Sequence, residues 1–206
     1  GKFAPNYAPT VPLNRTHDKR NLANFSCKMP QLAVVWGGTD RWPNMTDSKS
    51  EDGLSLADIG LEDGRQSDAA LAIQRGTMRL LSQFNIACLP EVVLPNHRRA
   101  DLMALTDKGE IWIIEIKSGL ADFQADDKWP DYLPYCDRFY FAVAPDFPSD
   151  KLPEQAGMIF ADSYGAEIMR DNTQPKLAAA RRNLLLRRMA RIGGFRWSRL
   201  RDKAEN

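Results

Sequence analysis

The chain has 206 residues, of which 43% are hydrophobic and 27% are charged, and this is enough for one substantial core. The formal net charge is only +1, so the charge of the whole chain favours neither a polyanionic nor a polycationic partner. Three widely spaced cysteines, no run of 18 apolar residues and no signal peptide argue against a disulfide framework, a zinc site and a membrane span, and we expect a cytoplasmic protein.

The first part of the chain, residues 1–66, contains scattered Pro, Asn, Asp and Gly with little periodicity. Such a composition is typical of a poorly ordered or extended segment. From residue 67 the pattern becomes regular, and we expect one domain over residues 67–195. Residues 196–206 form a basic C-terminal tail, which indicates either a solvated surface or a site for a polyanion.

The domain begins with a helix that Ser67 or Asp68 caps, because apolar residues recur behind them at helical spacing. The elements that follow are a strand in 87–95, a hairpin in 98–117, a helix in 119–129 stopped by Pro130, a strand in 137–145, two strands in 157–170, and a helix in 176–192. The last helix has an apolar stripe of Ala178, Leu185, Met189 and Ile192. The order α-β-β-β-α-β-β-β-α predicts an α/β fold, a central mixed β-sheet flanked by helices.

The hairpin carries charged residues where folding alone would favour apolar ones. Alternation along its second strand places Glu115 and Lys117 on the same face. If residues 107–109 form a three-residue loop with Gly109 in the left-handed region, Asp101 lies directly opposite Glu115, with Cβ atoms roughly 4.5–5.5 Å apart. A two-residue loop would shift the register and break this pairing.

Two readings of these charges remain open. Asp101 or Glu115 can form an ion pair with Lys117 at the end of the sheet. Two carboxylates ~4 Å apart, however, repel by about 4 kcal/mol at an effective dielectric constant near 20, and one lysine offsets only part of this. A divalent cation would neutralise both carboxylates, which favours a site for Mg²⁺ or Mn²⁺.

Asp101 followed by Glu115-x-Lys117, with a helix before and after the hairpin, resembles the PD-(D/E)XK nuclease superfamily of restriction-endonuclease-like folds. The wider strings "RRADLMAL…GEIWIIEIKSGLADFQADDKWPDYLPYCDRFYFAVAPDFP", "ADSYGAEIMR" and "LAAARRN" closely resemble the MmcB-like DNA repair family of bacteria. The resemblance covers about residues 67–195. Ala100 stands where the superfamily pattern has proline.

The resemblance implies a DNA repair protein with a metal-dependent endonuclease site. Asp101, Glu115 and the carbonyl of Ile116 would hold Mg²⁺ or Mn²⁺, and Lys117 would position or deprotonate the attacking water. Glu91, on the preceding strand, is a further candidate ligand of the metal. Gln74, on the polar side of the first helix, is a candidate auxiliary residue.

The expected partner is DNA, with a repair protein as a further candidate partner. Arginines and a lysine around the site are candidates for salt-sensitive contacts with phosphates: Arg75, Arg98, Arg99, Lys128, Arg181 and Arg182. We expect Asp122 to be a charge on a helix surface and Tyr132 to be a packing aromatic. Two alternatives remain, a nuclease-fold module that binds DNA without cutting it and a protein-interaction domain whose charges form only ion pairs.

Overall fold

The computed structural model describes residues 54, 66–125 and 127–204, all within the compact unit Met45–Asn206. The segment 1–66 that we expected to be poorly ordered lies, apart from Leu54 and Gln66, outside the described residues. The elements are α1 (Asp68–Gln83), β1 (Ala87–Val93), β2 (Arg99–Leu105), β3 (Ile111–Lys117), α2 (Leu120–Gln124), η2 (Trp129–Tyr135), β4 (Arg138–Val143), η3 (Ser149–Lys151), β5 (Gly157–Ala161), β6 (Ala166–Arg170) and α3 (Ala179–Ala204). The order of helices and strands predicted from the sequence is confirmed.

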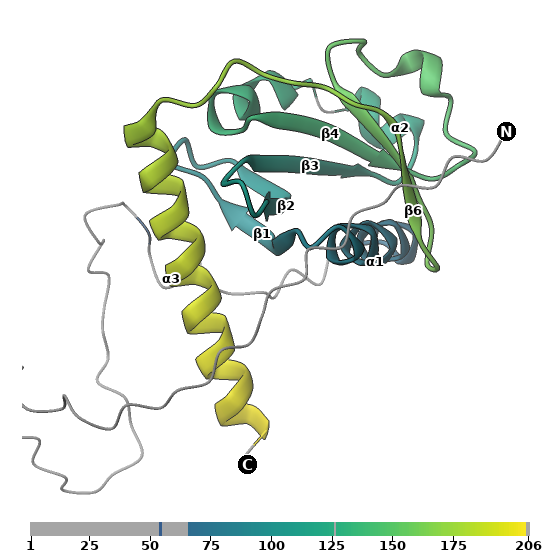
Figure 1. Cartoon of the computed structure of the whole chain (residues 1–206). Coiled ribbons are helices and arrows are strands. Elements are labelled where there is room, and N and C mark those ends of the chain that lie inside the picture. Colours follow the sequence, from purple (N-terminus) through teal and green to yellow (C-terminus); the bar gives the residue numbers. More distant parts are fainter. Residues whose placement is uncertain (1–53, 55–65, 126, 205–206) are drawn as a thin grey trace, which may run out of the picture. The chain divides into compact units, whose positions relative to one another are not determined.

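The six strands form one open mixed sheet in which they lie side by side in chain order (Figure 1). Strands β1, β2 and β3 are antiparallel neighbours, β4 runs parallel to β3 and to β5, and β6 returns antiparallel to β5. Strand β3 is therefore central and nearly all of its residues are buried, as its apolar sequence on both faces predicts.

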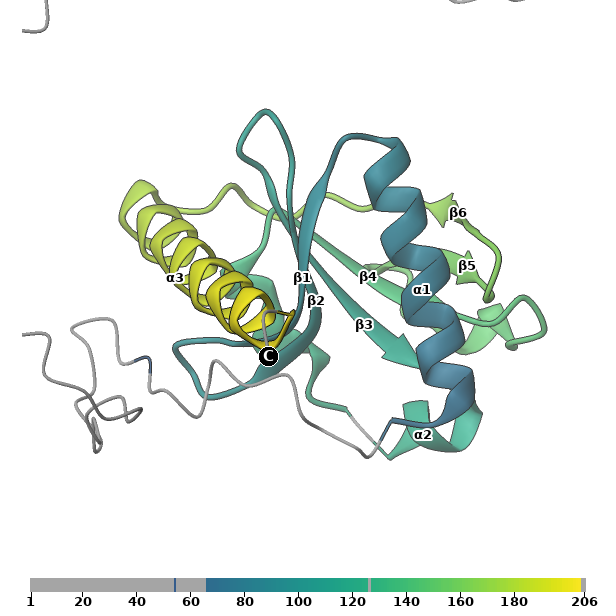
Figure 2. The ribbon, with the colours of Figure 1, turned by 90° about the horizontal axis from the view of Figure 1, so that it is seen from below.

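Helices cover the sheet on both faces. Helix α1 lies across one face, where Ile73 and Leu81 pack in a core with Ile114 and Tyr140 from the sheet (Figure 2). Helix α3 runs beside β1, and its Leu185, with Met189 and Ile192, joins the core of the opposite face. None of the helices formed by the described residues is long and apolar enough to cross a lipid bilayer.

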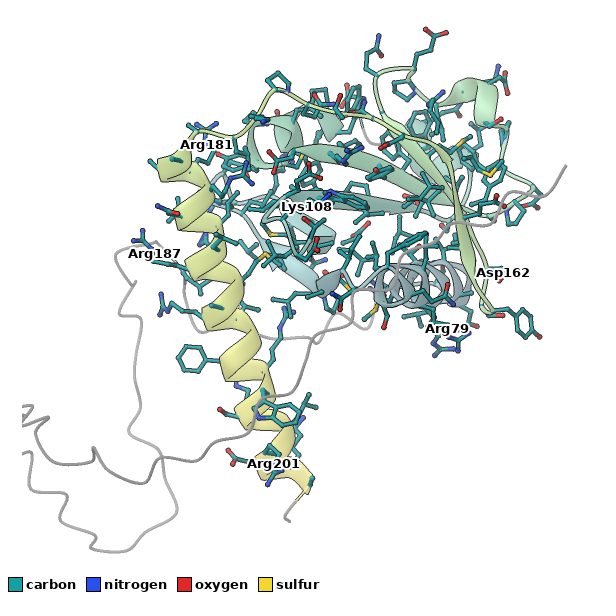
Figure 3. All side chains as sticks on the ribbon, viewed as in Figure 1. Arg79, Lys108, Asp162, Arg181, Arg187 and Arg201 are labelled. Atoms are coloured by element: carbon teal, nitrogen blue, oxygen red, sulfur yellow. The ribbon has the colours of Figure 1, made fainter. Side chains whose placement is uncertain are left out.

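Helix α1 begins as expected, since the side chain of Ser67 accepts a hydrogen bond from the N–H of Ala70. Further along, Gly76 lies against the turn between β5 and β6. A Cβ atom at this position would lie 2.1 Å from the carbonyl oxygen of Asp162, so no larger residue fits without moving backbone. Arg79, one turn on, donates to the carbonyl oxygen of Ser163 in the same turn (2.5 Å), and Figure 3 shows it beside Asp162.

Two helices differ from the prediction. The helix expected over 119–129 ends at Gln124, and a separate 3₁₀ helix, η2, follows. Pro130 lies in the first turn of η2 instead of stopping a helix, because the first helical positions need no N–H donor.

Helix α3 runs from Ala179 to Ala204 and so includes most of the segment that we expected as a tail. Its buried side ends with Arg196, and every residue from Trp197 to Ala204 is exposed (Figure 3). Ala178, which we placed on the apolar stripe, precedes the helix and is exposed. The predicted helix ended at residue 192, before the glycines at 193 and 194. The real helix continues through them because a glycine costs only about 1 kcal/mol in a helix.

Candidate active site

The loop between β2 and β3 has the predicted three-residue form. The N–H of Thr106 donates to the carbonyl of Glu110 (3.0 Å), and Gly109 adopts a φ of +80°. Leu102 is paired with Ile114, and continuing this register by one residue places Asp101 opposite Glu115. The register inferred from the glycine in the loop is confirmed.

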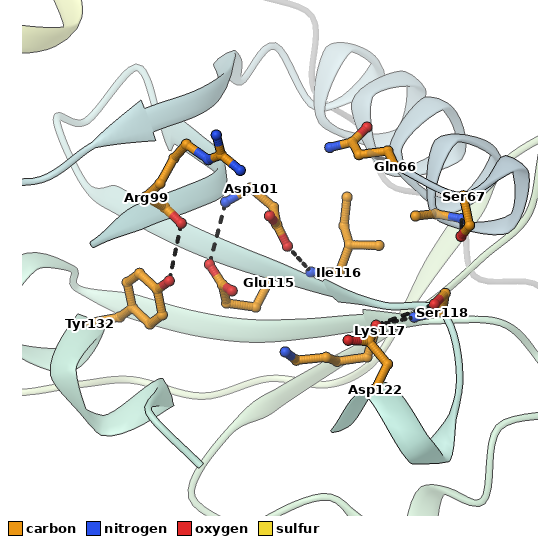
Figure 4. A pocket seen from close by; sticks show the side chains of 11 residues that line it. Gln66, Ser67, Arg99, Asp101, Glu115, Ile116, Lys117, Ser118, Asp122 and Tyr132 are labelled. Carbon is orange, nitrogen blue, oxygen red and sulfur yellow. Dashed lines mark hydrogen bonds between the residues drawn. The ribbon is translucent and has the colours of Figure 1, made fainter. Parts of the chain in front are cut away.

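The charged end of this hairpin opens into a pocket of about 420 Å³ (Figure 4). Side chains from the start of α1, from β2, β3 and η2, and from α2 and the segment before it meet there. The lining residues are Gln66, Ser67, Ala70, Arg99, Asp101, Glu115, Ile116, Lys117, Ser118, Asp122 and Tyr132. The structure thus brings Asp101, Glu115, Ile116 and Lys117 into one cavity.

Within the pocket, each carboxylate binds the backbone of the neighbouring strand. The N–H of Ile116 donates to Oδ2 of Asp101 (2.7 Å), and the N–H of Asp101 donates to Oε1 of Glu115 (3.3 Å). Glu115 and Lys117 are only 4% and 5% exposed, and Asp101 is half-buried. These bonds fix both carboxylates at the point where the ladder between β2 and β3 ends.

The carboxyl group of Asp101 has a perturbed pKa. Burial raises this pKa to about 6, against the hydrogen bond from Ile116, and the charge of Glu91 adds to the increase. Lys117 and Arg99 lower it by smaller amounts. The ionised form of Asp101 is therefore incompletely compensated by the groups around it, which favours an additional cation nearby.

The oxygen atoms that line this pocket limit the kind of metal ion that it could hold. Among residues 54, 66–125 and 127–204, no group of three or more His, Cys, Asp or Glu side chains is placed to hold a metal. Glu91, which we predicted as a further ligand, does not line the pocket. Two carboxylates and the Ile116 carbonyl remain, and Mg²⁺ is usually held by only one or two carboxylates together with waters and substrate phosphates.

A second set of contacts builds the wall of the pocket beside Asp101. Arg99 forms an ion pair with Glu91 (Nε to Oε2, 2.6 Å), and Gln66 donates to the other oxygen of Glu91 (2.6 Å). Tyr132 donates its hydroxyl to the carbonyl of Arg99 (3.0 Å), as Figure 4 shows. On the opposite side Asp122 accepts two hydrogen bonds from Ser118.

Several residues that we predicted at the site lie elsewhere. Arg98 pairs with the exposed Asp131 (2.7 Å) outside the pocket. Neither Gln74 nor Arg75 of α1 lines the pocket, and Lys128 is an exposed residue just before η2.

The two arginines at the start of α3 also have structural contacts. Arg181 donates to the carbonyl of Pro134 (3.0 Å) and its guanidinium lies over the ring of Tyr135. Arg182 binds both carboxylate oxygens of Asp137 (2.7 and 2.8 Å) near the opposite end of β3. Their contacts are those of packing residues, and neither lines the pocket.

The sequence interpretation missed five polar residues of the pocket, which are Gln66, Ser67, Ser118, Asp122 and Tyr132. Gln66 had been assigned to the N-terminal segment, Asp122 to a helix surface and Tyr132 to packing. Asp122 had a usable signal, since it follows Ser118 at i+4, the spacing of a local side-chain hydrogen bond. Gln66 and Tyr132 had no such signal in the sequence, because only the tertiary fold brings them to the pocket.

Comparison with known proteins identifies relatives. A family model described as "DNA repair protein MmcB-like" matches residues 57–204. Among solved structures, the SPO1766 protein of unknown function from Silicibacter pomeroyi is similar, with a TM-score of 0.65 and 41% sequence identity. That alignment covers 68% of this chain and 97% of the other. No curated protein matches the chain.

Proposed function

Since the chain belongs to the MmcB-like DNA repair family, we propose that it is a metal-dependent nuclease of the PD-(D/E)XK type that hydrolyses a phosphodiester bond of DNA. The observation that supports this most is the meeting of Asp101, Glu115 and Lys117 in one pocket. Burying a glutamate and a lysine at 4–5% exposure costs several kcal/mol per charge unless excellent geometry repays it. A site that binds a cation and a phosphate gives these residues a reason to be there.

Asp101, Glu115 and the carbonyl of Ile116 would hold Mg²⁺ or Mn²⁺. When bound, the ion would acidify a water and neutralise charge that develops on the phosphate. Because the pKa of Asp101 is about 6, its carboxyl group is mostly ionised at neutral pH and is available as a ligand.

The cationic residues of the pocket have separate tasks in this proposal. Lys117 holds the attacking water or accepts a proton from it, since its amine lies on the same face of β3 as Glu115. Arg99, whose side chain is 47% exposed at the pocket, binds a phosphate oxygen of the DNA backbone. These contacts do not depend on base identity, so we expect recognition of DNA structure more than of sequence.

Cleavage assays test this proposal directly. With Mn²⁺ and a panel of single-stranded, duplex and branched DNAs, the wild type should cut at least one substrate. Asp101→Ala and Lys117→Ala should each reduce the rate by about 100-fold or more while DNA binding is retained. Lys108→Ala, in the loop at the other end of the hairpin, is the matched control and should cut normally (Figure 3).

Two outcomes would replace the proposal. Retained, salt-dependent DNA binding with no cleavage of any substrate would indicate a non-catalytic DNA-binding module. Absence of DNA binding even at low salt would indicate a protein-interaction domain. Calorimetric titration with Mg²⁺ tests metal binding independently of cleavage. The wild type should bind the ion, and Asp101→Ala should abolish the heat of binding.

A further inference from the structure

Glu91 is a buried carboxylate outside the pocket that contacts two residues inside it. The residue is 6% exposed, its Oε1 accepts a hydrogen bond from the side-chain amide of Gln66 (2.6 Å), and its Oε2 forms an ion pair with Nε of Arg99 (2.6 Å). Arg99 comes from β2 and Gln66 from the residue before the cap of α1. One carboxylate therefore joins two walls of the pocket that are far apart in the sequence.

The backbone at Glu91 is also unusual. Its φ of +51° is uncommon for a residue other than glycine, and such conformations persist only where the surroundings enforce them. The paired positions of β1 and β2 pass from Pro90–Leu102 to Val92–Ala100 without a pair at Glu91. Arg196 of α3, itself 6% exposed, donates to the carbonyl oxygens of Pro90 and of Glu91 (2.9 Å to Glu91). Helix α3 thereby supports this conformation.

We infer that Glu91 is a positioning residue that orients the guanidinium of Arg99 toward a DNA phosphate in the pocket. This inference rests on the proposed function, because it takes the ligand of the pocket to be DNA phosphate. A guanidinium binds phosphate best through two parallel N–H donors, so the orientation of its plane determines the strength of the contact. The ion pair at 2.6 Å holds the guanidinium of Arg99 beside Glu91 before the ligand arrives, which reduces the entropy lost on binding.

The neighbouring arginine provides a comparison within the same strand region. Arg98 also pairs with a carboxylate, that of Asp131, but this partner is 51% exposed and Arg98 does not line the pocket. A phosphate in the pocket would therefore meet the arginine held by the buried acid and not the one held by the exposed acid.

A substitution that keeps the charge tests the geometry alone. Glu91→Asp shortens the side chain by one methylene, and aspartate tolerates a positive φ better than most residues. Affinity for a short DNA duplex is measured in EDTA, without any cleavage, for the full chain. We expect Glu91→Asp to weaken binding about fivefold and the matched Asp131→Glu to change it less than about twofold.

A double-mutant cycle separates positioning from general loss of structure. In an Arg99→Ala background Glu91→Asp should change the affinity by less than about 1.5-fold, since the residue through which it acts is gone. Arg99→Lys keeps the charge but lacks the planar guanidinium with its parallel N–H donors, so it should weaken DNA binding. Arg98→Lys should leave DNA binding unchanged. This pair of variants tests the inference even if Glu91→Asp unfolds.

Either of two results would overturn the inference: an unchanged affinity in Glu91→Asp and Arg99→Lys, or a Glu91→Asp effect that persists without Arg99. Because the assay contains no metal, a protein that binds DNA with this pattern but never cuts it would contradict the nuclease proposal alone.

Discussion

One aspartate lies beside each end of β3, Asp137 at the loop end and Asp101 at the pocket end, and the two carboxylates are in opposite electrostatic conditions. At the loop end, burial raises the pKa of Asp137, but hydrogen bonds from Arg182 and from the N–H groups of Ile111 and Leu177 outweigh it and lower the pKa overall. At the pocket end, burial dominates and raises the pKa of Asp101 to about 6. The same residue type is compensated within the fold at one end and incompletely compensated at the other.

The difference indicates what each end contributes. A carboxylate whose pKa is lowered by an arginine and backbone donors stabilises the folded state at neutral pH. A carboxylate whose pKa is raised reduces stability at neutral pH, and such groups are concentrated at functional sites. Three substitutions test this contrast.

The largest expected effect is at the loop end. Asp137→Ala should lower the free energy of unfolding by about 3 kcal/mol, because it leaves the partly buried guanidinium of Arg182 without its carboxylate. Denaturant titration measures this loss. The control Asp171→Ala removes a carboxylate that is 60% exposed and paired with Arg138, and it should cost less than Asp137→Ala. Equal losses of stability in the two variants would mean that the contacts of Asp137 with Arg182 and the backbone contribute no more than an exposed ion pair.

An intermediate effect of opposite sign is expected at the pocket. Asp101→Asn should stabilise the metal-free protein at pH 8 by roughly 2 kcal/mol, since the pKa of Asp101 rises from 3.8 to about 6 on folding. The folded state then binds more protons than the unfolded state between these values, so the wild type loses stability as the pH rises through this range. The asparagine can still accept the bond from Ile116.

The pH dependence provides the check on that prediction. Denaturant titrations in EDTA at several pH values should show the advantage of Asp101→Asn shrinking as the pH falls below 6 and disappearing near the ordinary pKa of 3.8. An advantage that is constant with pH would mean that the stabilisation comes from packing and not from the charge.

The smallest effect is expected for Glu115→Gln. The amide oxygen can replace Oε1 as the acceptor of the Asp101 N–H, while the repulsion between the two carboxylates is removed. We expect stability in EDTA to stay within about 1 kcal/mol of the wild type, or to rise. A clear loss in denaturant titrations would argue against two carboxylates that repel each other in this pocket.

The sequence was most informative where local rules determine geometry. A loop with Gly109 at a positive φ set the register of β2 and β3, and that register placed Asp101 opposite Glu115. Alternation of apolar residues identified the strands, including the buried β3. These features depend on residues close together in the chain, and they could be predicted without coordinates.

The sequence was least informative for charges that pair over long distances. The sequence predicted Arg182 as a phosphate ligand but gave no sign of its ion pair with Asp137, which lies 45 residues away in the chain. The sequence predicted Glu91 as a metal ligand but gave no sign of its positive φ or of the buried Arg196 that donates to its carbonyl oxygen. For charged residues the partner determines the role, and that partner is known only once the sheet and α3 are assembled.

The tight contact at Gly76 has a consequence for how proteins with this architecture can diverge. Because the β5–β6 turn occupies the space of a side chain at position 76, even alanine would displace α1 along the sheet. The same helix begins after its N-cap Ser67, which lines the pocket. Substitutions where α1 contacts the β5–β6 turn can therefore alter the mouth of the cavity. We expect the residues at this contact to vary much less among related proteins than their distance from the charged residues suggests.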